Sequence, residues 1–193
     1  MSKKSDIWLI TGGGRSGKSA YAEKLVVDET GAHDSGVLYI ATGIATDEEM
    51  EERIAHHRAR RPLNWITWER YRSLADIEKE FKNDSFDAIL LDCVANLLMG
   101  ILFEEIPDAD SFESKEFEIV EGIVIKEIDT LCKYARDRGK RLVFVTNEIG
   151  MGIIPSTRYS RYYRDALGRI NKHIAEVSDK AVLMVAGLPV MLK

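Results

Sequence analysis

The sequence has little cysteine, no long apolar run and no basic tract, and each absence excludes a class of protein. Only two of the 193 residues are cysteines, Cys93 and Cys132, which argues against a disulfide framework and against a four-ligand zinc site. No apolar run reaches the roughly 18 residues that a membrane-spanning helix needs, and the first residues do not form the apolar region of a signal peptide. We therefore expect a cytoplasmic protein without a transmembrane segment.

The charge balance is mildly acidic. There are 27 Lys and Arg residues against 32 Asp and Glu residues, which gives a formal net charge of −5 and a pI near 5.5. General nucleic-acid binding is not expected, because its affinity comes mostly from basic residues that neutralise phosphates. With 45% apolar residues, the chain is long enough to bury a sizeable core. No repeat or linker divides it, so we predict one domain over residues 1–193.

What the sequence does have is a regular alternation of short apolar runs with segments of helical period. The apolar runs predict buried strands at Ile7–Thr11, Val37–Ala41, Ala88–Asp92, Leu142–Asn147 and Ala181–Val185, followed by a short edge strand at Val190–Leu192. The segments between them predict helices at Lys18–Glu29, Asp47–Arg60, Ser73–Phe81, Ser114–Arg138 and Ser156–Ser178, with Gly139 as a C-terminal cap. This alternation is typical of the α/β class, with a mostly parallel sheet flanked by helices.

The first predicted strand runs directly into a stretch that fits the phosphate-binding pattern G-x-x-x-x-G-K-[ST]. The stretch consists of Gly12, Gly13, Gly14, Arg15, Ser16, Gly17, Lys18 and Ser19. In such a loop the backbone N–H groups face a phosphate chain, Lys18 reaches the terminal phosphates and the Ser19 hydroxyl binds Mg²⁺. A glycine-rich turn is the alternative, but the strand before it and the helix after it favour the loop. We therefore predict a P-loop NTPase-like fold of the RecA-like kind.

A P-loop usually needs a carboxylate at the end of a neighbouring buried strand to hold the metal, directly or through water. Asp92 ends the predicted strand Ala88–Asp92 and supplies this group. An aspartate in this position can also be a helix cap or a turn residue. The two features together predict the use of a nucleotide, whereas hydrolysis, kinase chemistry and nucleotidyl transfer stay open.

Two adjacent histidines lie near the end of the predicted helix Asp47–Arg60. At about 100° per residue, His57 shares the apolar stripe of Met50 and Ile54, whereas His56 lies roughly 120° away among charged residues. We interpret His57 as a packed, hydrogen-bonded side chain. The neutral imidazole of His56 could attack phosphorus as a nucleophile, although its spacing alone favours a solvated histidine.

These motifs together resemble the bifunctional adenosylcobinamide kinase / adenosylcobinamide-phosphate guanylyltransferase family of cobalamin biosynthesis. The likeness extends from about Ile7 to Lys193, which is nearly the whole chain. The matching stretches are Thr11–Ser19, Tyr39–Thr42, Asp47–His57, Arg61–Pro62, Leu90–Cys93, Thr146–Pro155 and Arg161–Asn171. Many families share a P-loop, but its combination with the Ile-Ala-His-His and Thr-Asn-Glu-Ile-Gly-Met-Gly segments is specific.

The resemblance implies two reactions on one scaffold. ATP or GTP phosphorylates the aminopropanol hydroxyl of adenosylcobinamide, and GTP then donates GMP to adenosylcobinamide phosphate, which gives adenosylcobinamide-GDP and pyrophosphate. The family carries GMP on a histidine, and the matching position here is His56, with Lys18 as the second catalytic residue. It also implies a homotrimer and Mg²⁺ bound at Ser19 and Asp92. Besides the P-loop, the matching nucleotide contacts are Thr42, Gly43, Ile44, His57, Arg58, Ala59, Arg60, Glu69 and Asp92.

Two further features of the sequence each allow two interpretations. Glu148 follows a predicted strand and could hold a ligand hydroxyl or a metal-bound water, or it could cap the next helix. Arg158, Arg161 and Arg164 are spaced by three on one predicted helix, which favours a solvated or interfacial face over a site for phosphate or corrin side chains.

Two other functions also stay open. The chain could be a monofunctional P-loop kinase of small molecules in which His56 only helps binding. It could also be a nucleotide-sensing switch that binds GTP and a partner without turnover.

Overall fold

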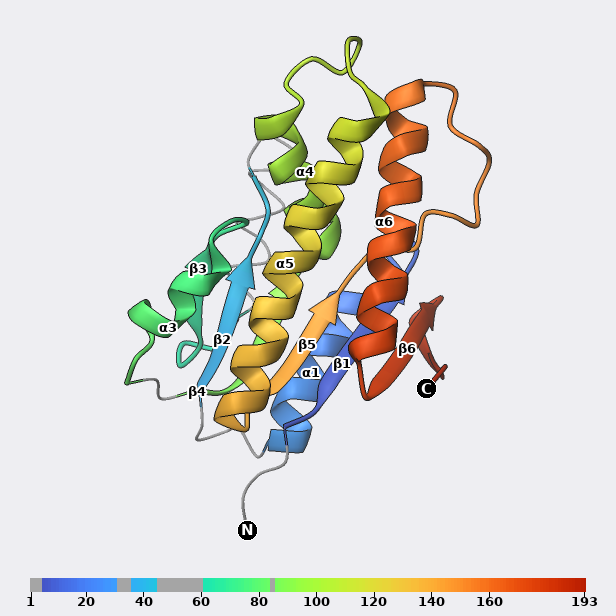
Figure 1. Ribbon diagram of the computed structural model, residues 1–193. Coiled ribbons are helices and arrows are strands. Elements are labelled where there is room, and N and C mark those ends of the chain that lie inside the picture. The colour runs from blue at the N-terminus through green and yellow to red at the C-terminus, as the bar shows by residue number, and fades with distance from the viewer. Residues whose placement is uncertain (1–4, 31–35, 45–60, 84–85) are drawn as a thin grey trace.

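The computed structural model describes residues 5–30, 36–44, 61–83 and 86–193. This part of the chain forms a seven-stranded sheet in the order β3-β2-β4-β5-β1-β6-β7 (Figure 1). All neighbouring strands are parallel except β6 and β7, which are antiparallel. The strands are β1 (Ile7–Gly12), β2 (Gly36–Ala41), β3 (Ile66–Glu69), β4 (Phe86–Asp92), β5 (Arg141–Val145), β6 (Lys180–Val185) and β7 (Leu188–Met191).

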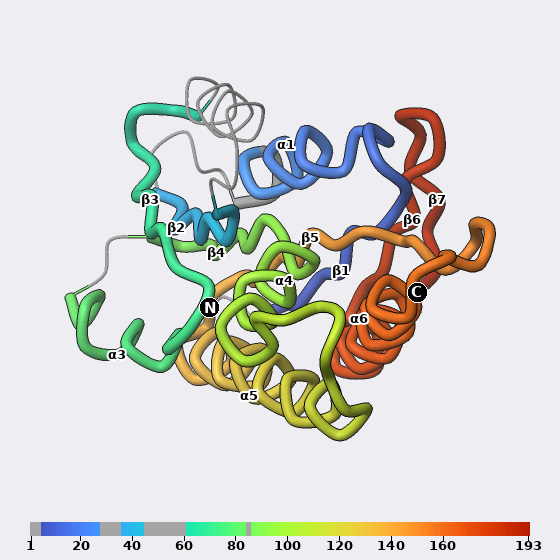
Figure 2. The backbone as a smooth tube through the Cα atoms, turned by 90° about the horizontal axis from the view of Figure 1, so that it is seen from above, coloured from blue at the N-terminus to red at the C-terminus, as the bar shows by residue number. Residues whose placement is uncertain are grey.

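Helices cover both faces of the sheet. Figure 2 shows α1 on one face and α5 and α6 on the opposite face, where α4 packs against α5. The helical segments are α1 (Lys18–Thr30), the 3-10 turn η1 (Leu74–Asp76), α3 (Ile77–Glu80), α4 (Val94–Glu105), α5 (Ser114–Arg138) and α6 (Arg158–Val177). The central strands are apolar throughout because helices bury both of their sides: Ile10, Ile40, Leu90 and Phe144 are fully buried. None of the helices in the described ranges is long and apolar enough to cross a bilayer.

The predicted α/β class, with a mostly parallel sheet and a C-terminal antiparallel strand, is confirmed. The long helix Ser114–Arg138 has the predicted bounds, and Gly139 ends it in the left-handed conformation at φ 63°. The prediction of a single helix over residues 73–81 is wrong. The structure has a 3-10 turn followed by an α-helix of one turn. The predicted helix Asp47–Arg60 lies outside the described residues.

Further boundaries differ from the prediction. Strand β5 ends at Val145 rather than Asn147, and α6 begins at Arg158 rather than Ser156. The edge strand β7 spans Leu188–Met191 rather than Val190–Leu192, because its pairing with β6 already begins at Leu188. Thr157 precedes α6, and its hydroxyl accepts a hydrogen bond from the backbone of Ser160, which fixes where the helix starts.

Two elements were not predicted from the sequence. Helix α4 is mostly buried and apolar around its circumference, so it lacks the one-sided period of an amphipathic helix. Strand β3 has only four residues, and its pairing with β2 decides its conformation.

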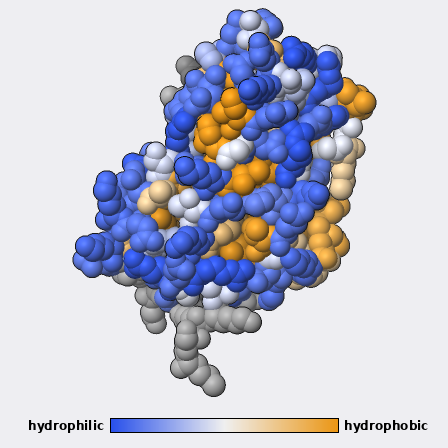
Figure 3. Space-filling model, in the orientation of Figure 1, coloured by the Kyte–Doolittle hydropathy of each residue, from blue (hydrophilic) through white to orange (hydrophobic). Residues whose placement is uncertain are grey.

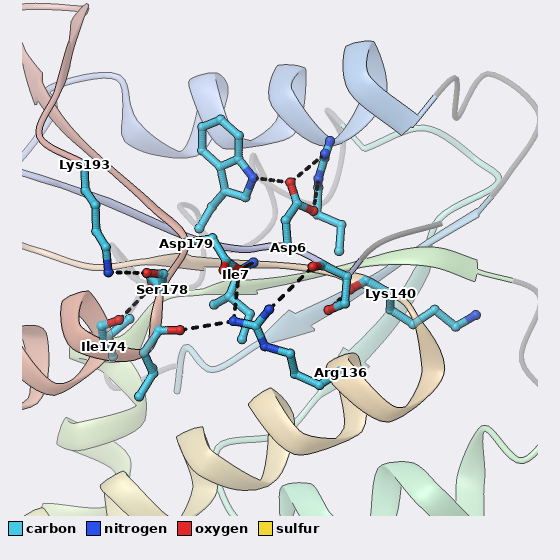
Figure 4. A network of polar contacts seen from close by, with 12 residues as sticks. Asp6, Ile7, Arg136, Lys140, Ile174, Ser178, Asp179 and Lys193 are labelled. Carbon is cyan, nitrogen blue, oxygen red and sulfur yellow. Dashed lines mark hydrogen bonds and ion pairs between the residues drawn. The ribbon is translucent and has the colours of Figure 1, made fainter. Parts of the chain in front are cut away.

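A polar network ties the amino-terminal ends of the strands together (Figure 4). Asp179 accepts a hydrogen bond from the backbone of Ile7 at 2.8 Å and forms an ion pair with Arg136 at 3.0 Å. Asp6 accepts two hydrogen bonds from the guanidinium of Arg141, both at 2.8 Å. These groups lie at the edge opposite the strands' carboxyl ends, so this edge is a structural one.

Candidate functional site

The carboxyl ends of five strands lie at one level along the opposite edge of the sheet. Ala41 at the end of β2 is in register with Glu69 of β3 and Asp92 of β4. Asp92 is in turn in register with Val145 of β5, which pairs with Ile10 of β1. Open α/β sheets bind ligands just outside this edge, so the candidate residues that end these strands share one surface.

The loop between β1 and α1 combines glycines of two kinds. Gly12 has φ 151°, and a Cβ built on it would lie 2.5 Å from the carbonyl oxygen of Met184, so only glycine fits there. Gly13 and Gly14 are exposed, and a Cβ on either would meet nothing within 4 Å. The fold therefore requires the first glycine, whereas the other two leave open space over the loop in which a phosphate chain can approach the backbone.

Neighbouring segments fix this loop from two sides. The backbone N–H of Glu148 donates to Gly12 O at 2.9 Å, and the N–H of Gly187 donates to Ser16 O at 3.1 Å. The buried hydroxyls Thr11 Oγ1 and Ser16 Oγ find no hydrogen-bond partner in the described structure. Buried hydroxyls normally have a partner, so the two atoms indicate a place where a polar ligand or water completes the bonding.

The Lys18 residue is buried, and its side chain folds back over the loop. Its residue exposure is 7%, and Nζ donates to Gly13 O at 2.6 Å. Burial lowers the pKa of Lys18 below its usual 10.5, and the negative charge of Asp92 acts in the opposite direction. The ammonium is thus held beside the open space above the loop, where it can exchange the carbonyl for a phosphate oxygen.

One side chain from β2 and one from the residue after β2 hold Asp92 and the backbone that follows it. The hydroxyl of Tyr39 donates to Asp92 Oδ2 at 2.8 Å, and the buried Thr42 hydroxyl binds the backbone of the next residue, Cys93. Burial raises the pKa of Tyr39 far above its usual value and the charge of Asp92 raises it further, so this hydroxyl acts as a donor. Cys93 is the cap residue of α4 and no side chain caps that helix, which argues against the capping role for Asp92.

The oxygen donors at this edge suit a hard divalent cation. Ser19 is in the first turn of α1 and Asp92 ends β4, and both are partly exposed. Within the described ranges, no group of three or more His, Cys, Asp and Glu residues could hold a metal ion. A hydroxyl with one carboxylate fits Mg²⁺, which typically takes its remaining ligands from phosphates and water.

The predicted nucleotide contacts divide into three groups. The P-loop residues 12–19, the segment Thr42–Ile44 and Asp92 lie at the carboxyl edge. Glu69 lies at the same edge but on β3, with three strands between it and β1, so the fold does not bring it beside the P-loop. The remaining predicted contacts His57, Arg58, Ala59 and Arg60 lie outside the described residues, as does the predicted nucleophile His56.

Glu148 does not cap the following helix, so that alternative is wrong. Its Oε1 accepts a hydrogen bond from the N–H of Gly150 at 2.6 Å, while Thr157 caps α6. The Glu148 carboxylate is therefore used within its own loop, two residues along the chain, and its side chain is partly exposed beside the P-loop.

The three arginines of α6 make contacts within the protein, which neither interpretation from the sequence predicted. Arg158 lies over the ring of Phe112 at 4.5 Å and donates to the Phe112 carbonyl at 3.1 Å. Arg161 donates to the carbonyls of Pro155 and Ser156 at 3.0 and 2.7 Å. Arg164 pairs with the adjacent Asp165 at 2.9 Å.

The sequence did not indicate that Asn171 positions the loop after β5. Its side chain accepts from the hydroxyl of Thr146 at 2.7 Å and donates to the carbonyl of Asn147 at 3.0 Å. With Arg161 at its other end, the loop is fixed to α6 at both ends, and its middle projects Met151 and Ile153 into solvent, 80% and 96% exposed. Figure 3 shows apolar surface where this loop protrudes.

A groove of about 500 Å³ lies beside this loop. It is lined by Gly150, Gly152, Ile154, Arg164, Asp165, Gly168, Arg169 and Lys172.

Comparison with known proteins finds a family match over nearly the whole chain. The family model described as cobinamide kinase / cobinamide phosphate guanyltransferase matches residues 8–192. The bifunctional adenosylcobalamin biosynthesis proteins CobU of Escherichia coli (strain K12) and Salmonella typhimurium (strain LT2) are each 39% identical, over 96% of this chain and 98% of their own lengths. The bifunctional adenosylcobalamin biosynthesis protein CobP of Pseudomonas aeruginosa (strain PAO1) is 36% identical, over 96% of both chains.

Proposed function

The chain belongs to the cobinamide kinase / cobinamide phosphate guanyltransferase family, and from this premise we propose how one nucleotide site serves both reactions. The enzyme phosphorylates adenosylcobinamide with ATP or GTP, and it then transfers GMP from GTP to adenosylcobinamide phosphate. The match to the family over residues 8–192 carries this conclusion. The relatives that match at full length are named bifunctional, which favours this function over a monofunctional kinase and over a switch without turnover.

In the kinase reaction, the aminopropanol hydroxyl oxygen attacks the γ-phosphorus. The bond from that phosphorus to the β,γ-bridging oxygen breaks, the nucleoside diphosphate leaves, and the hydroxyl proton passes to solvent. The loop backbone and the buried Lys18 ammonium stabilise the charge on the phosphate oxygens, because both are already oriented before the substrate binds.

In the guanylyltransferase reaction, a ring nitrogen of His56 attacks the α-phosphorus of GTP and pyrophosphate leaves. A phosphate oxygen of adenosylcobinamide phosphate then attacks the same phosphorus, and the P–N bond breaks to release adenosylcobinamide-GDP and the free histidine. Two successive displacements allow the same Lys18 and loop to act on both triphosphates. A single domain of 193 residues is then sufficient for both activities.

Mg²⁺ is part of this proposal. It would bind at the hydroxyl of Ser19 and the carboxylate of Asp92, and when bound it neutralises charge on the phosphates. Tyr39 and Thr42 serve this site by holding Asp92 and the backbone that follows it. Thr42, Gly43 and Ile44 contact the nucleotide from the end of β2, and His57, Arg58, Ala59 and Arg60 are further contacts in this proposal. Glu69, three strands from β1, contacts a part of the nucleotide remote from the phosphates on the P-loop.

We also propose that the enzyme is a cytoplasmic homotrimer. The edge strand β7 and the residue after it carry exposed apolar side chains, among them Leu188, Met191 and Leu192, which are 58–68% exposed. Exposed apolar side chains on an edge strand favour association with another protein surface. Sedimentation should give a mass of three chains, and the double variant Leu188→Lys, Met191→Glu should sediment as a smaller species. A monomeric parent protein would contradict the assembly.

The decisive experiment follows the label from GTP that carries radioactive phosphorus in the α position. After denaturation, the parent protein should retain acid-labile, alkali-stable label, whereas His56→Ala should retain none. His173→Ala is the matched control, because His173 lies on α6 and contacts Asp129, away from the loop. Label that persists in His56→Ala, or no label in the parent protein, would refute the covalent step.

The His56→Ala variant and the parent protein also test the kinase reaction independently. His56→Ala should still transfer the γ-phosphate to adenosylcobinamide, since that step does not need the histidine. A parent protein that phosphorylates adenosylcobinamide but never takes up GMP would be the monofunctional kinase. A protein that binds GTP and turns over neither substrate would be the switch.

A further inference from the structure

The groove between the β5–α6 loop and α6 is connected to the P-loop by hydrogen bonds. The backbone N–H of Glu148 donates to Gly12 O at 2.9 Å, and the Glu148 carboxylate accepts from the N–H of Gly150, which lines the groove. Figure 1 shows the chain leaving the end of β5 and turning back to the start of α6 alongside that helix. The groove therefore begins two residues from a direct contact with the first glycine of the P-loop.

Glycines leave the surface of the groove open. A Cβ built on Gly152 or on Gly168 would meet nothing within 4 Å. Gly168 is exposed in the interior of α6, although the interior of a helix disfavours glycine. Packing against the described residues therefore does not require this glycine, whereas a ligand that lies closely against the helix would require it.

The loop also presents apolar side chains that its own fold does not bury. Ile154 lines the groove and is 67% exposed, and Ile153 before it is almost fully exposed. The loop is held at both ends, because Asn171 bonds to its first residues and Arg161 bonds to its last ones. Its apolar side chains thus project from a fixed backbone, as at a site that binds an apolar surface.

The polar side chains of the groove carry both signs of charge. Asp165 and Lys172 are exposed on α6. Both arginines of the groove are paired with carboxylates, Arg164 with Asp165 at 2.9 Å and Arg169 with Glu121 at 2.8 Å. The groove therefore offers donors and acceptors without a strong positive field, which suits uncharged amides better than a bare phosphate.

We propose that this groove binds the corrin ring of the acceptor, adenosylcobinamide or its phosphate. The inference rests on the proposed function, which requires such an acceptor beside the P-loop. A corrin is a broad ring that carries uncharged carboxamide side chains around its edge. One edge of it enters the groove of about 500 Å³, where the apolar loop and the glycines contact the ring and Asp165 and Lys172 bind carboxamides. The aminopropanol arm then extends past Glu148 toward the phosphates on the P-loop.

Two substitutions change the groove without removing a buried group. Gly168→Leu fills the open space over α6, and Ile154→Ser removes an exposed apolar side chain. The matched control for the first is Gly122→Leu, because Gly122 is an exposed glycine of α5 whose added Cβ would also meet nothing within 4 Å. The control for the second is Ile119→Ser, because Ile119 is an exposed apolar residue of α5 and does not line the groove. Thermal unfolding checks that all four variants fold.

The first measurement is the affinity for adenosylcobinamide. Calorimetric titration in the presence of a GTP analogue that cannot transfer its γ-phosphate gives this affinity without turnover. Gly168→Leu and Ile154→Ser should each weaken binding about tenfold or more, whereas the two α5 variants should bind as the parent protein does. Parent affinity in Gly168→Leu, or an equal loss in Gly122→Leu, would overturn the inference.

The second measurement separates the groove from the nucleotide site and from an interface between copies of the chain. Uptake of the α-phosphate label from GTP needs no acceptor, so Gly168→Leu should take up label as the parent protein does while its KM for adenosylcobinamide rises about tenfold or more. Loss of label in this variant, or sedimentation as a smaller species, would overturn the assignment of the groove to the acceptor. Failure of the proposed function has a different outcome, because the parent protein itself would then neither bind adenosylcobinamide nor take up label.

Discussion

The hydroxyl of Thr42 binds both polar backbone groups of Cys93. Its Oγ1 donates to the carbonyl oxygen at 2.7 Å and accepts from the N–H at 2.8 Å, and both residues are buried. These bonds join the end of β2 to the residue that follows Asp92. The uncharged Thr42 side chain therefore fixes the backbone next to Asp92, the proposed metal ligand.

Replacing Thr42 by valine should therefore destabilise both the fold and the site. The substitution keeps the shape but leaves the Cys93 N–H and carbonyl without the hydroxyl, which should lower the free energy of unfolding by roughly 2–4 kcal/mol. Affinity for the Mg²⁺–nucleotide complex should fall with it. Urea unfolding and calorimetry measure the two effects. Thr42→Ser retains the hydroxyl and should stay close to the parent protein, and a Thr42→Val protein of unchanged stability would contradict this role.

Removing the charge of Lys18 should reduce both reactions. Lys18→Met keeps the aliphatic stem but not the ammonium, so kcat for phosphoryl transfer and for GMP transfer should each fall about 10²- to 10³-fold. Initial-rate assays with each substrate measure this. Lys24→Met is the control, since Lys24 is exposed on the same helix. If only one of the two reactions responds, they do not share this phosphate site.

Two adjacent glycines should respond differently to the same added methyl group. Gly12→Ala would place a Cβ 2.5 Å from Met184 O at a φ that disfavours alanine, so the protein should lose melting temperature and nucleotide binding together. Gly13→Ala meets nothing within 4 Å and should fold normally while weakening nucleotide binding, because the methyl group stands where the phosphates approach. Thermal unfolding beside nucleotide titration separates the two. Equal melting temperatures for both variants would contradict the distinction.

The network at the amino-terminal edge predicts acid sensitivity. Burial would raise the pKa of Asp6, but the hydrogen bonds from Arg141 and Trp8 outweigh it, and the net pKa lies below the usual 3.8. The folded state thus favours the ionised carboxylate. This stabilisation is complete above the unfolded-state pKa and disappears as the pH falls through the lower folded-state pKa.

Asp6→Asn should accordingly lose stability at neutral pH, by roughly 2 kcal/mol, and lose less further stability than the parent protein below about pH 4. Urea unfolding between pH 7 and pH 3 measures the slope. Asp110→Asn, on an exposed loop, serves as the control. Parallel stability curves for the parent protein and Asp6→Asn would show that the Arg141 pair contributes nothing.

The sequence predicted the parts of the fold that depend on local chemistry. Apolar runs of strand length, the helix Ser114–Arg138 and its cap Gly139 follow from periodicity and backbone preference, and the structure confirms them. Helix α4 was not predicted, because burial on all sides removes the apolar periodicity by which a helix is recognised in a sequence. Strand β3 was not predicted, because four residues are too few to show the alternation of a strand.

The candidate site divides in the same way. The P-loop is contiguous, so its residue types and spacing are enough to predict its conformation and the position of Lys18. The neighbours of Asp92 are not contiguous in sequence, because Tyr39 and Thr42 reach residues 92 and 93 from more than fifty positions away. In the same way, Asn171 on α6 reaches Thr146 after β5.

By itself, then, the sequence determined a P-loop between a strand and a helix and a carboxylate at the end of another strand. Only the tertiary structure decided that Tyr39 holds that carboxylate, that Glu148 bonds within its own loop, and that the arginines of α6 serve packing. The physical reason is that loop conformation depends on neighbours in the chain. Hydrogen bonding and stacking between distant side chains depend on strand order and register, which no local pattern records.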